Sequence, residues 1–465
     1  MLDEARPLEK WVLDLLLAGF LALVVANAWL CDDAYITFRT VDNVVNGYGL
    51  TWNVAERVQV YTHPLWMLLM SGFYALTGEI FFTSLLVSIG LSLLAVGLLA
   101  LVVANSPSKG ALAVAVLALS KAFVDYATSG LENPLTHVIL VAFIAVYVRR
   151  RGTLRRVGLL SLLAALGMVN RLDTALLYGP ALLWAVVESR DPKSLLTGAL
   201  GFLPLMAWEL FSLFYYGSLV PNTALAKLNA GLIRPVDIWR EGLFYLENSL
   251  RVDPITLVTI GVGVALPILA RDWRKLPLAG GVVLMVLYVA RVGGDFMSGR
   301  FLTVPLCVAV CLLATTSWRP RRFPPWLPRI AVPALLLILG VTAPYTPVRA
   351  SGARSADDDP NVWVKGRSIT DERANYYRNT GLLEAIRRGV ELPDHDWARE
   401  GRKAREAGGV VVRGSVGFFG FFAGPDVRVV DILALGDPLL ARLPVTDPNW
   451  QIGHFGRRPP AGYLE

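Results

Sequence analysis

Long apolar runs recur along most of this 465-residue chain and constrain its fold more than any other feature. Charged residues make up 17% of the sequence, against about 25% in soluble domains. Runs of about 20 residues can cross the hydrocarbon core of a bilayer as helices. The pattern predicts a polytopic α-helical membrane protein with about eleven transmembrane helices, at 11–30, 81–104, 110–127, 134–148, 156–169, 174–188, 194–215, 254–270, 276–291, 300–317 and 329–345.

The basic residues predict how these helices are oriented. The net charge of +7 comes largely from short loops between apolar runs, at 149–156, 271–275 and 319–322. Loops of this kind face the cytoplasm in membrane proteins, so we expect membrane lipid and no nucleic acid as a partner. With a cytoplasmic N-terminus, the segments that face outward are 32–80, 128–133, 170–173, 216–253, 292–299 and everything after about 346.

The change in composition at about residue 345 predicts two domains. Residues 1–345 contain the apolar runs and would form a transmembrane catalytic domain. A shorter apolar stretch at 64–76 is expected to form a helix lying at the membrane interface. Residues 346–465 contain no long apolar run and are expected to form a small extracytoplasmic α/β domain.

Short patterns within the last 120 residues support the α/β prediction. Alternating apolar residues at 410–412 and 427–430 predict strands, and 381–388 predicts a helix. The glycine-rich stretch 414–420 follows a predicted strand but lacks the spacing of a dinucleotide-binding loop. We therefore interpret it as a turn.

Two adjacent carboxylates, Asp32 and Asp33, directly follow the first apolar run. Charge this close to lipid is unfavourable unless it faces water or binds something. Neighbouring carboxylates also repel each other, which raises the pKa of one of them unless a cation intervenes. A carboxylate with a shifted pKa is a competent general base towards a hydroxyl. The acid pair is therefore the predicted catalytic centre.

The predicted outer loops carry side chains that suit a sugar site. Aromatic rings stack on the apolar faces of sugars, and acids and amides bind the hydroxyls. Trp52 and Tyr61 are such aromatics, although a belt of aromatic residues at the lipid headgroups is an alternative interpretation. The other candidates for binding the sugar or the acceptor in these loops are Arg39, His63, Glu132 and Asp295.

A second group of outer residues suits a phosphate. Lys227 offers a positive charge and Asn222 a hydrogen-bond donor, although Lys227 can equally be an interfacial lysine. Arg171 and Arg300 are further candidates, because a guanidinium matches the oxygens of a phosphate. Each arginine can instead pair with a nearby aspartate, so an arginine left over from such pairs is the better candidate.

Six segments of the sequence carry a family resemblance: Asp-Asp-Ala-Tyr-Ile (32–36), Asn-Gly-Tyr-Gly-Leu-Thr-Trp-Asn (46–53), Glu-Arg-Val-Gln-Val-Tyr-Thr-His-Pro-Leu-Trp (56–66), Tyr-Tyr-Gly-Ser-Leu-Val-Pro-Asn-Thr-Ala-Leu-Ala-Lys (215–227), Gly-Gly-Asp-Phe-Met-Ser-Gly-Arg-Phe-Leu (293–302) and Asp-Pro-Leu-Leu-Ala-Arg-Leu-Pro (437–444). Together they resemble the membrane arabinofuranosyltransferases of the GT-C class. The likeness extends from the first apolar run to the C-terminal tail.

The resemblance implies a GT-C fold in a bacterial cytoplasmic membrane and a polyprenyl-phosphate-linked arabinofuranose as donor, used on the outer side. It implies that Asp32 or Asp33 is the essential carboxylate, and we favour Asp32 as the base with Asp33 as its partner. His454 and Arg457 of the tail would reach back to hold the acceptor or the phosphate. A divalent cation, Mg²⁺ or Ca²⁺, would suit the oxygen ligands, but nothing in the spacing requires one. The acceptor stays open between a glycan and a pilin-like protein.

Three alternatives remain. The same scaffold would also serve another polyprenyl-phosphate sugar, such as a hexose or aminoarabinose, and the sequence discriminates poorly here. A transporter would place ionisable residues near mid-membrane, whereas the predicted helix centres are nearly free of charge. A membrane-anchored assembly protein would leave the acid pair unexplained. We therefore expect a transferase.

Overall fold

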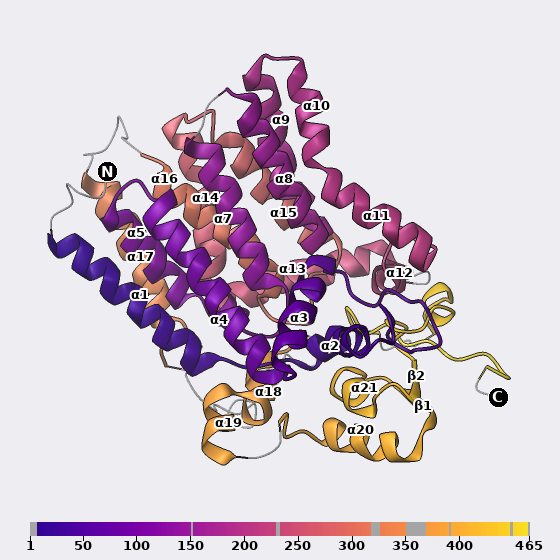
Figure 1. Ribbon diagram of the computed structural model, residues 1–465. Coiled ribbons are helices and arrows are strands. Elements are labelled where there is room, and N and C mark those ends of the chain that lie inside the picture. The colour runs from indigo at the N-terminus through magenta and orange to yellow at the C-terminus, as the bar shows by residue number, and fades with distance from the viewer. Residues whose placement is uncertain are drawn as a thin grey trace.

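The computed structural model describes most of the chain, namely residues 7–149, 152–228, 233–317, 326–349, 369–389, 392–446 and 450–463. This part is mostly helical, with one two-stranded sheet near the C-terminus. In Figure 1 the helices form a bundle, and the C-terminal segment packs against one end of it. The basic loop predicted at 319–322 lies outside the described residues, as do residues 150 and 151 of the loop at 149–156.

The predicted apolar runs form helices close to their predicted limits. These helices are α1 (Pro7–Asn27), α4 (Phe81–Gly97) with the π-helical turn η1 (Leu98–Val103), α5 (Pro107–Leu119), α7 (Asn133–Arg149), α8 (Leu154–Asn170), α9 (Ala175–Ser189), α10 (Lys193–Gly201), α11 (Leu203–Tyr216), α14 (Pro254–Ala270), α15 (Leu276–Arg291), α16 (Thr303–Thr315) and α17 (Trp326–Thr342).

Two predicted runs are interrupted. The run at 110–127 ends as α5 at Leu119, because Ser120 caps a new short helix, α6 (Lys121–Asp125), by accepting the N–H of Phe123. The run at 194–215 divides into α10 and α11, which are bent by 50°. Pro204 lies in the first turn of α11, where its missing N–H and fixed φ favour a helix start over a continuous helix.

The predicted outer loops contain helices of their own. α2 (Asp32–Val45) leaves α1 at 86°, and α13 (Pro235–Val252) meets α14 at 109°. α3 (Pro64–Thr77) matches the helix predicted at 64–76. The remaining short elements between the longer helices are η2 (Leu172–Thr174), α12 (Asn222–Leu228) and η3 (Arg300–Leu302).

The predicted number of transmembrane helices is not confirmed. Among the described residues, one helix is long and apolar enough to cross a membrane, the 23-residue helix Phe81–Val103. The number reaches four if each of three bent pairs, α1 with α2, α10 with α11 and α13 with α14, is one span. Six more apolar helices have 10–17 residues, shorter than a straight crossing usually needs. Eleven spans therefore stay a prediction.

The core of the bundle is built around α16, all of whose residues are buried. This explains why α16 is apolar on every face rather than along one stripe. Small residues let neighbouring helices come close to it. A Cβ on Gly263 of α14 would lie 2.6 Å from the Cβ of Ala309.

The loops gather at two opposite ends of the bundle, as the predicted sidedness requires. At one end, Glu188 at the end of α9 forms ion pairs with Arg156 of α8 and with Arg274 of the loop before α15. At the other end, Glu132 before α7 forms ion pairs with Arg171 and Arg300. Which end faces the cytoplasm stays a prediction.

The C-terminal segment contains the predicted strands and helix. Its elements are α18 (Glu372–Thr380), α19 (Leu382–Arg388), α20 (Asp396–Ala407), β1 (Gly409–Arg413), α21 (Gly417–Ala423), β2 (Val427–Asp431) and η6 (Leu440–Arg442). The strands are parallel, with Gly409 opposite Val427, and α21 connects them. The interpretation of 414–420 as a turn is therefore wrong in part, because a helix begins at Gly417.

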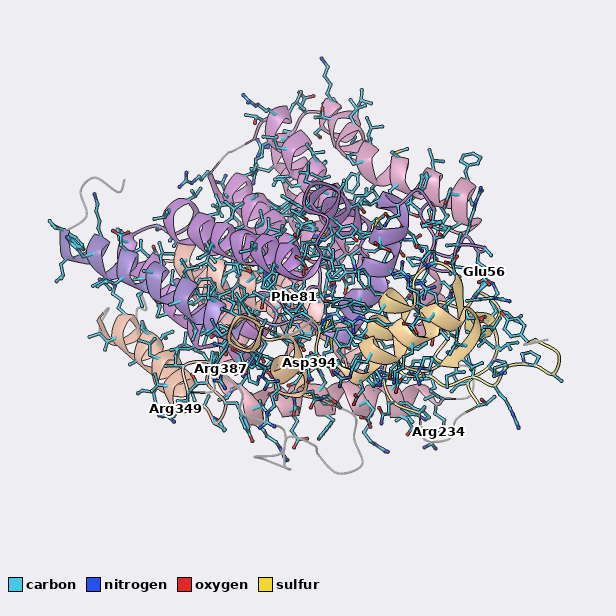
Figure 2. All side chains as sticks on the ribbon, turned by 60° about the horizontal axis from the view of Figure 1, so that its bottom comes forward. Glu56, Phe81, Arg234, Arg349, Arg387 and Asp394 are labelled. Atoms are coloured by element: carbon cyan, nitrogen blue, oxygen red, sulfur yellow. The ribbon has the colours of Figure 1, made fainter. Side chains whose placement is uncertain are left out.

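This segment packs against residues 32–80, the predicted first outer loop. α21 lies beside α2 in Figure 1. Arg428 of β2 forms an ion pair with Glu56 at 2.7 Å, and Figure 2 shows Glu56 next to the C-terminal ribbon. The boundary of a separate domain at residue 345 stays a prediction.

Candidate active site

Asp32 begins α2, and the C-terminal segment holds its carboxylate. Oδ1 accepts the N–H of Phe418 at 2.7 Å, and Oδ2 accepts the N–H of Gly417 at 3.1 Å. These N–H groups belong to the first turn of α21, where a helix offers donors without internal partners. A Cβ on Gly417 would lie 1.9 Å from the carbonyl oxygen of Asp32, so only glycine permits this approach. Burial raises the pKa of Asp32 to about 7, although the two N–H groups favour its charged form.

Asp33 is less buried than Asp32 and lies in a different environment. In the described part of the chain its carboxylate has neither a hydrogen bond nor an ion pair. Its charge acts on residues from four other segments: His63, Arg300, Glu372 and His454. Among the described residues, the Asp33 carboxylate is therefore an acid without a partner at the point where these segments meet.

A buried ionic cluster centred on Glu132 lies beside Asp33 and holds Arg171 and Arg300 in place. Glu132 lies 3.2 Å from Nη1 of Arg171 and 3.2 Å from Nη2 of Arg300. Burial alone would raise the pKa of Glu132, but the nearby cations, Arg300 foremost, hold it well below its ordinary value. Both arginines also lie over the ring of Phe301, Arg171 at 4.5 Å and Arg300 at 5.8 Å from its centre. Glu132 therefore fixes both guanidiniums in place.

Both Arg171 and Arg300 are paired with carboxylates, so neither is the unpaired arginine that we expected to be the better phosphate candidate. Arg171 also forms two hydrogen bonds with Asp173, at 2.8 and 2.9 Å. Arg300 lies 3.5 Å from Asp295. Three carboxylates thus face two guanidiniums, so the cluster as a whole is not cationic. Arg300 nevertheless keeps its buried Nε without a hydrogen-bond partner among the described residues.

His63 joins this cluster as a neutral side chain. Its Nδ1 lies 3.4 Å from Glu132 without hydrogen-bond geometry, and its Nε2 is 2.8 Å from Oγ1 of Thr37. Burial lowers the pKa of His63 to about 4, even though Glu132 opposes the shift. His63 is therefore uncharged at neutral pH and orients α2 through Thr37.

His454 links Lys227 to the surroundings of Asp33, because the charges of both residues act on it. Lys227 on α12 is half-buried and has no acidic partner in the part of the chain that the structure describes. The His454 ring packs edge-on against Phe296, with 4.4 Å between ring centres. Burial lowers the pKa of His454, and the charges of Asp33 and Lys227 both act on it. Lys227 is thus a cation available to an anionic ligand.

Two predicted sugar-binding residues instead join the predicted first outer loop, residues 32–80, to the C-terminal segment. Arg39 is buried and donates hydrogen bonds of 2.8 Å to the carbonyls of Trp52, Gly420 and Val427. Trp52 is fully buried, with the Arg39 guanidinium 4.8 Å from its ring centre. Their contacts give both residues a role in folding.

Three further predicted residues also make structural contacts. The amide nitrogen of Asn222 donates to the carbonyls of three residues in the segment 434–437, at 2.9 to 3.1 Å, so it has no donor left for a phosphate. Arg457 donates to the carbonyl of Ala226 at 2.6 Å. The hydroxyl of Tyr61 lies 2.8 Å from that of Tyr216.

Glu372 belongs to the site but was not singled out from the sequence. It begins α18 and is buried. Burial, together with the charges of Asp33 and Asp32, raises the pKa of Glu372 well above its ordinary value. A carboxylic acid kept neutral in this way can donate a hydrogen bond. No local pattern singles it out, because Glu372 lies between two other charged residues in a polar stretch.

The described residues include no group of three or more His, Cys, Asp or Glu side chains arranged to hold a metal ion. The expected Mg²⁺ or Ca²⁺ therefore stays a prediction. The described site therefore brings together a carboxylate without a hydrogen-bond partner, Asp33, an acid whose neutral form is favoured by burial, Glu372, and a lysine without an acidic partner, Lys227.

Comparison with known proteins identifies the family. No family model matches the chain. The sequence is 30% identical to the terminal beta-(1->2)-arabinofuranosyltransferase of Mycobacterium tuberculosis over 507 aligned positions, covering 89% of this chain and 78% of the relative. The chain belongs to the terminal beta-(1->2)-arabinofuranosyltransferase family. The resemblance stated from the sequence motifs is thereby confirmed, and the chain is a glycosyltransferase.

A second member of this arabinofuranosyltransferase family, from Corynebacterium glutamicum, is 26% identical over 328 positions, or 60% of this chain and 46% of the relative. Among solved structures, the apo oligosaccharyltransferase of Archaeoglobus fulgidus aligns with a TM-score of 0.49 at 11% identity. That alignment covers 93% of this chain and 65% of the oligosaccharyltransferase.

Proposed function

We propose that this chain transfers arabinofuranose from a polyprenyl-phosphate donor to a hydroxyl of an acceptor on the outer face of the bacterial cytoplasmic membrane. Family membership supports the choice of arabinofuranose. The observation that carries the proposal is the Asp33 carboxylate. It has no partner in the described structure and lies where the first outer loop, the Gly293–Arg300 loop and the C-terminal tail meet.

Asp33 acts as the base, and Asp32 positions it. A general base needs a lone pair directed at the hydroxyl proton, and both oxygens of Asp32 already accept backbone N–H groups. This reverses the order of roles that we favoured from the sequence. Asp32 fixes the start of α2 against α21 and so fixes the position of the next residue.

Transfer then needs a proton acceptor and a site for the leaving group. The acceptor oxygen bonds to the anomeric carbon and gives its proton to Asp33, while the bond from that carbon to the phosphate oxygen breaks. The sugar has oxocarbenium character in between, which nearby carboxylates stabilise. Polyprenyl phosphate leaves with the bonding electrons, and Lys227, with Nε of Arg300, stabilises its charge.

The acceptor is a glycan or a pilin-like protein, and the residues near it are His454, Glu372 and Asp295. Burial raises the pKa of Glu372 and lowers that of His454, which favours the neutral form of both, and they serve as hydrogen-bonding partners for sugar hydroxyls. A divalent cation would supply further charge neutralisation next to Asp33, and its requirement is tested by adding a chelator.

The experiment compares two donors with the purified full-length chain in detergent. One carries arabinofuranose on polyprenyl phosphate, and the other carries a hexose on the same lipid. Release of polyprenyl phosphate is followed in the presence and absence of an arabinan fragment. We expect turnover with the arabinofuranose donor alone. Turnover with only the hexose donor would contradict the assignment of the sugar, and no release from either would contradict the lipid donor.

A further inference from the structure

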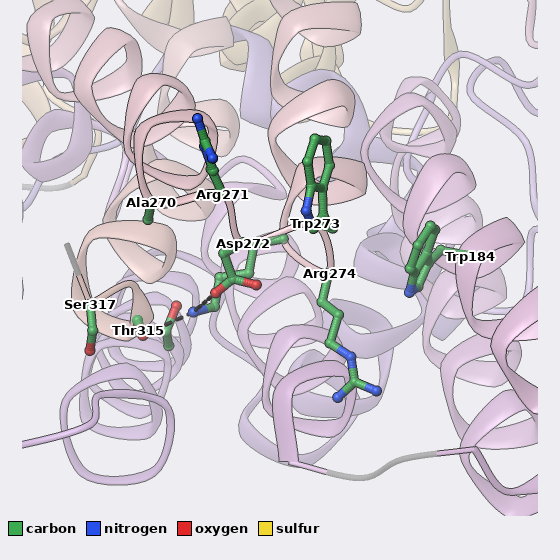
Figure 3. Close-up of a pocket in the computed structure, with 9 residues that line it drawn as sticks. Trp184, Ala270, Arg271, Asp272, Trp273, Arg274, Thr315 and Ser317 are labelled. Carbon is green, nitrogen blue, oxygen red and sulfur yellow. Dashed lines mark hydrogen bonds and ion pairs between the residues drawn. The ribbon is translucent and has the colours of Figure 1, made fainter. Parts of the chain in front are cut away.

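A cavity of about 610 Å³ opens at the end of the bundle opposite the candidate active site. Figure 3 shows that Trp273 and Arg274 come from the turn between α14 and α15, with Trp184 of α9 across from them. The residues that line the cavity are Trp184, Ala270, Arg271, Asp272, Trp273, Arg274, Lys275, Thr315 and Ser317.

The cavity is separate from the site described above. It lies at the first residue of α15, whereas the last residue of α15 leads into the Gly293–Arg300 loop. A helix of 16 residues is about 24 Å long, so a ligand in the cavity does not reach Asp33.

Positive charge dominates the lining. Arg271, Arg274 and Lys275 line the cavity together with a single acid, Asp272. Lys275 is bound to Asp272 at 2.7 Å and to the carbonyl of Thr315 at 3.0 Å. Arg274 is bound to Glu188 at 2.5 Å. These contacts hold two of the cations in place.

The third cation has no acidic partner. Arg271 caps the end of α14, and its exposed side chain forms no ion pair within the described part of the chain. The nearby Glu188 pairs with Arg156 and Arg274, and no ion pair joins it to Arg271. The cavity is therefore short of negative charge, which an anionic ligand would supply.

Two exposed tryptophans add an aromatic surface to the basic lining of the cavity. Trp184 is 36% exposed and Trp273 is 66% exposed. Exposed indoles beside basic side chains are typical of the level of lipid headgroups. A soluble anion has no apolar part to pack against these rings, whereas a phospholipid also places glycerol and the start of its acyl chains against them.

We propose that this cavity binds the phosphate of an anionic phospholipid in the cytoplasmic leaflet, with Arg271 as its direct partner. The proposal rests on the membrane orientation given under the proposed function, in which the basic turn faces the cytoplasm. Basic pockets between helices on that side suit anionic headgroups, and each lysine or arginine near an anionic surface contributes about 1 kcal/mol. Arg274, paired with Glu188, and Lys275, paired with Asp272, add to the positive electrostatic potential around the phosphate.

The test replaces Arg271 with Asn in the full-length protein. Arg271 has a φ of 55°, a left-handed conformation that Asn tolerates, so the variant keeps the turn. Arg190→Asn is the matched control. Arg190 caps α9 at the same end of the bundle with a φ of 53° and is exposed, but it does not line the cavity.

Native mass spectrometry in detergent measures the binding of phosphatidylglycerol, phosphatidylcholine and soluble glycerol phosphate. We expect the wild type and Arg190→Asn to bind phosphatidylglycerol in preference to phosphatidylcholine, and Arg271→Asn to bind it about fivefold more weakly, the loss expected for one basic residue. Equal weakening by the two substitutions would overturn the proposal. So would equal binding of phosphatidylcholine, or binding of glycerol phosphate as tight as that of the lipid.

The outcome is distinguishable from failure of the proposed function. Arg271→Asn should release polyprenyl phosphate at the wild-type rate in detergent without added phospholipid, because the cavity lies far from Asp33. If the wild type shows no transferase activity but the lipid preference depends on Arg271, only the transferase proposal fails. If activity is present without that preference, only the lipid site fails.

Discussion

Replacing Gly417 with Ala tests whether the contact between α21 and Asp32 builds the active site. The new Cβ would lie 1.9 Å from the carbonyl oxygen of Asp32 and 2.7 Å from its Cγ. Real Cβ contacts are essentially never under 3.0 Å, so α21 must move away by about 1 Å. That movement lengthens the hydrogen bonds to Asp32, now 2.7 and 3.1 Å. A hydrogen bond contributes about 0.5–1.5 kcal/mol, or about 1.5–3 kcal/mol when one partner is charged, and the pKa of Asp32 is about 7, so we expect unfolding at pH 7 to cost about 3 kcal/mol less.

The matched control is Gly414→Ala in the same loop, where the nearest atom to a new Cβ is Cδ1 of Ile432 at 3.6 Å, an ordinary contact. Chemical unfolding in detergent and release of polyprenyl phosphate are measured for both variants. Gly417→Ala should be less stable and lose most of its turnover, because Asp33 loses its position, whereas Gly414→Ala should resemble the wild type. Equal stability and turnover in the two variants would refute the reasoning.

Three further changes test single groups. Burial raises the pKa of Asp32 from 3.8 to about 7, so the stability that Asp32 contributes is complete below pH 3.8 and is lost as the pH rises through 7. The free energy of unfolding, measured by denaturant titration, should therefore decline less over that window in Asp32→Asn than in the wild type. Equal declines in the two proteins would contradict the shifted pKa. Glu132→Gln leaves Arg171 and Arg300 without their shared carboxylate and should cost about 3 kcal/mol of unfolding free energy, so unchanged denaturation would count against the cluster. Lys227→Met should reduce turnover at saturating donor at least tenfold with unchanged unfolding temperature, and wild-type turnover would exclude Lys227 as the phosphate partner.

The sequence was sufficient where structure depends on local pattern. The apolar run predicted at 174–188 is α9 (Ala175–Ser189), and the strand predicted at 427–430 is β2 (Val427–Asp431). The placement of Arg156 and Arg274 at the end of the bundle opposite Glu132 also followed from the sequence, because successive helices run in opposite directions, and which end faces the cytoplasm stays a prediction. The number of spans stays a prediction, because proline and serine positions divide two of the predicted runs into shorter helices.

The roles of individual site residues depend on partners far along the chain, which the sequence cannot reveal. The partners of Asp32 are 385 and 386 residues away, and they occupy both of its carboxylate oxygens. Arg39 and Asn222 looked like ligand-binding residues because their side chains are rich in donors, yet carbonyls of the C-terminal segment occupy those donors. Glu372 becomes part of the site only because α18 brings it to the acid pair.

The most direct test of the catalytic proposal is the rate at which Asp33→Asn releases polyprenyl phosphate from polyprenyl-phosphate arabinofuranose, relative to the wild type. Asn is nearly isosteric with Asp and cannot take up the acceptor proton. A positioned general base contributes about 100-fold to 10,000-fold, so the rate should fall by at least about 100-fold with unchanged unfolding temperature. A rate for Asp33→Asn close to that of the wild type, in a folded protein, would show that Asp33 is not the base.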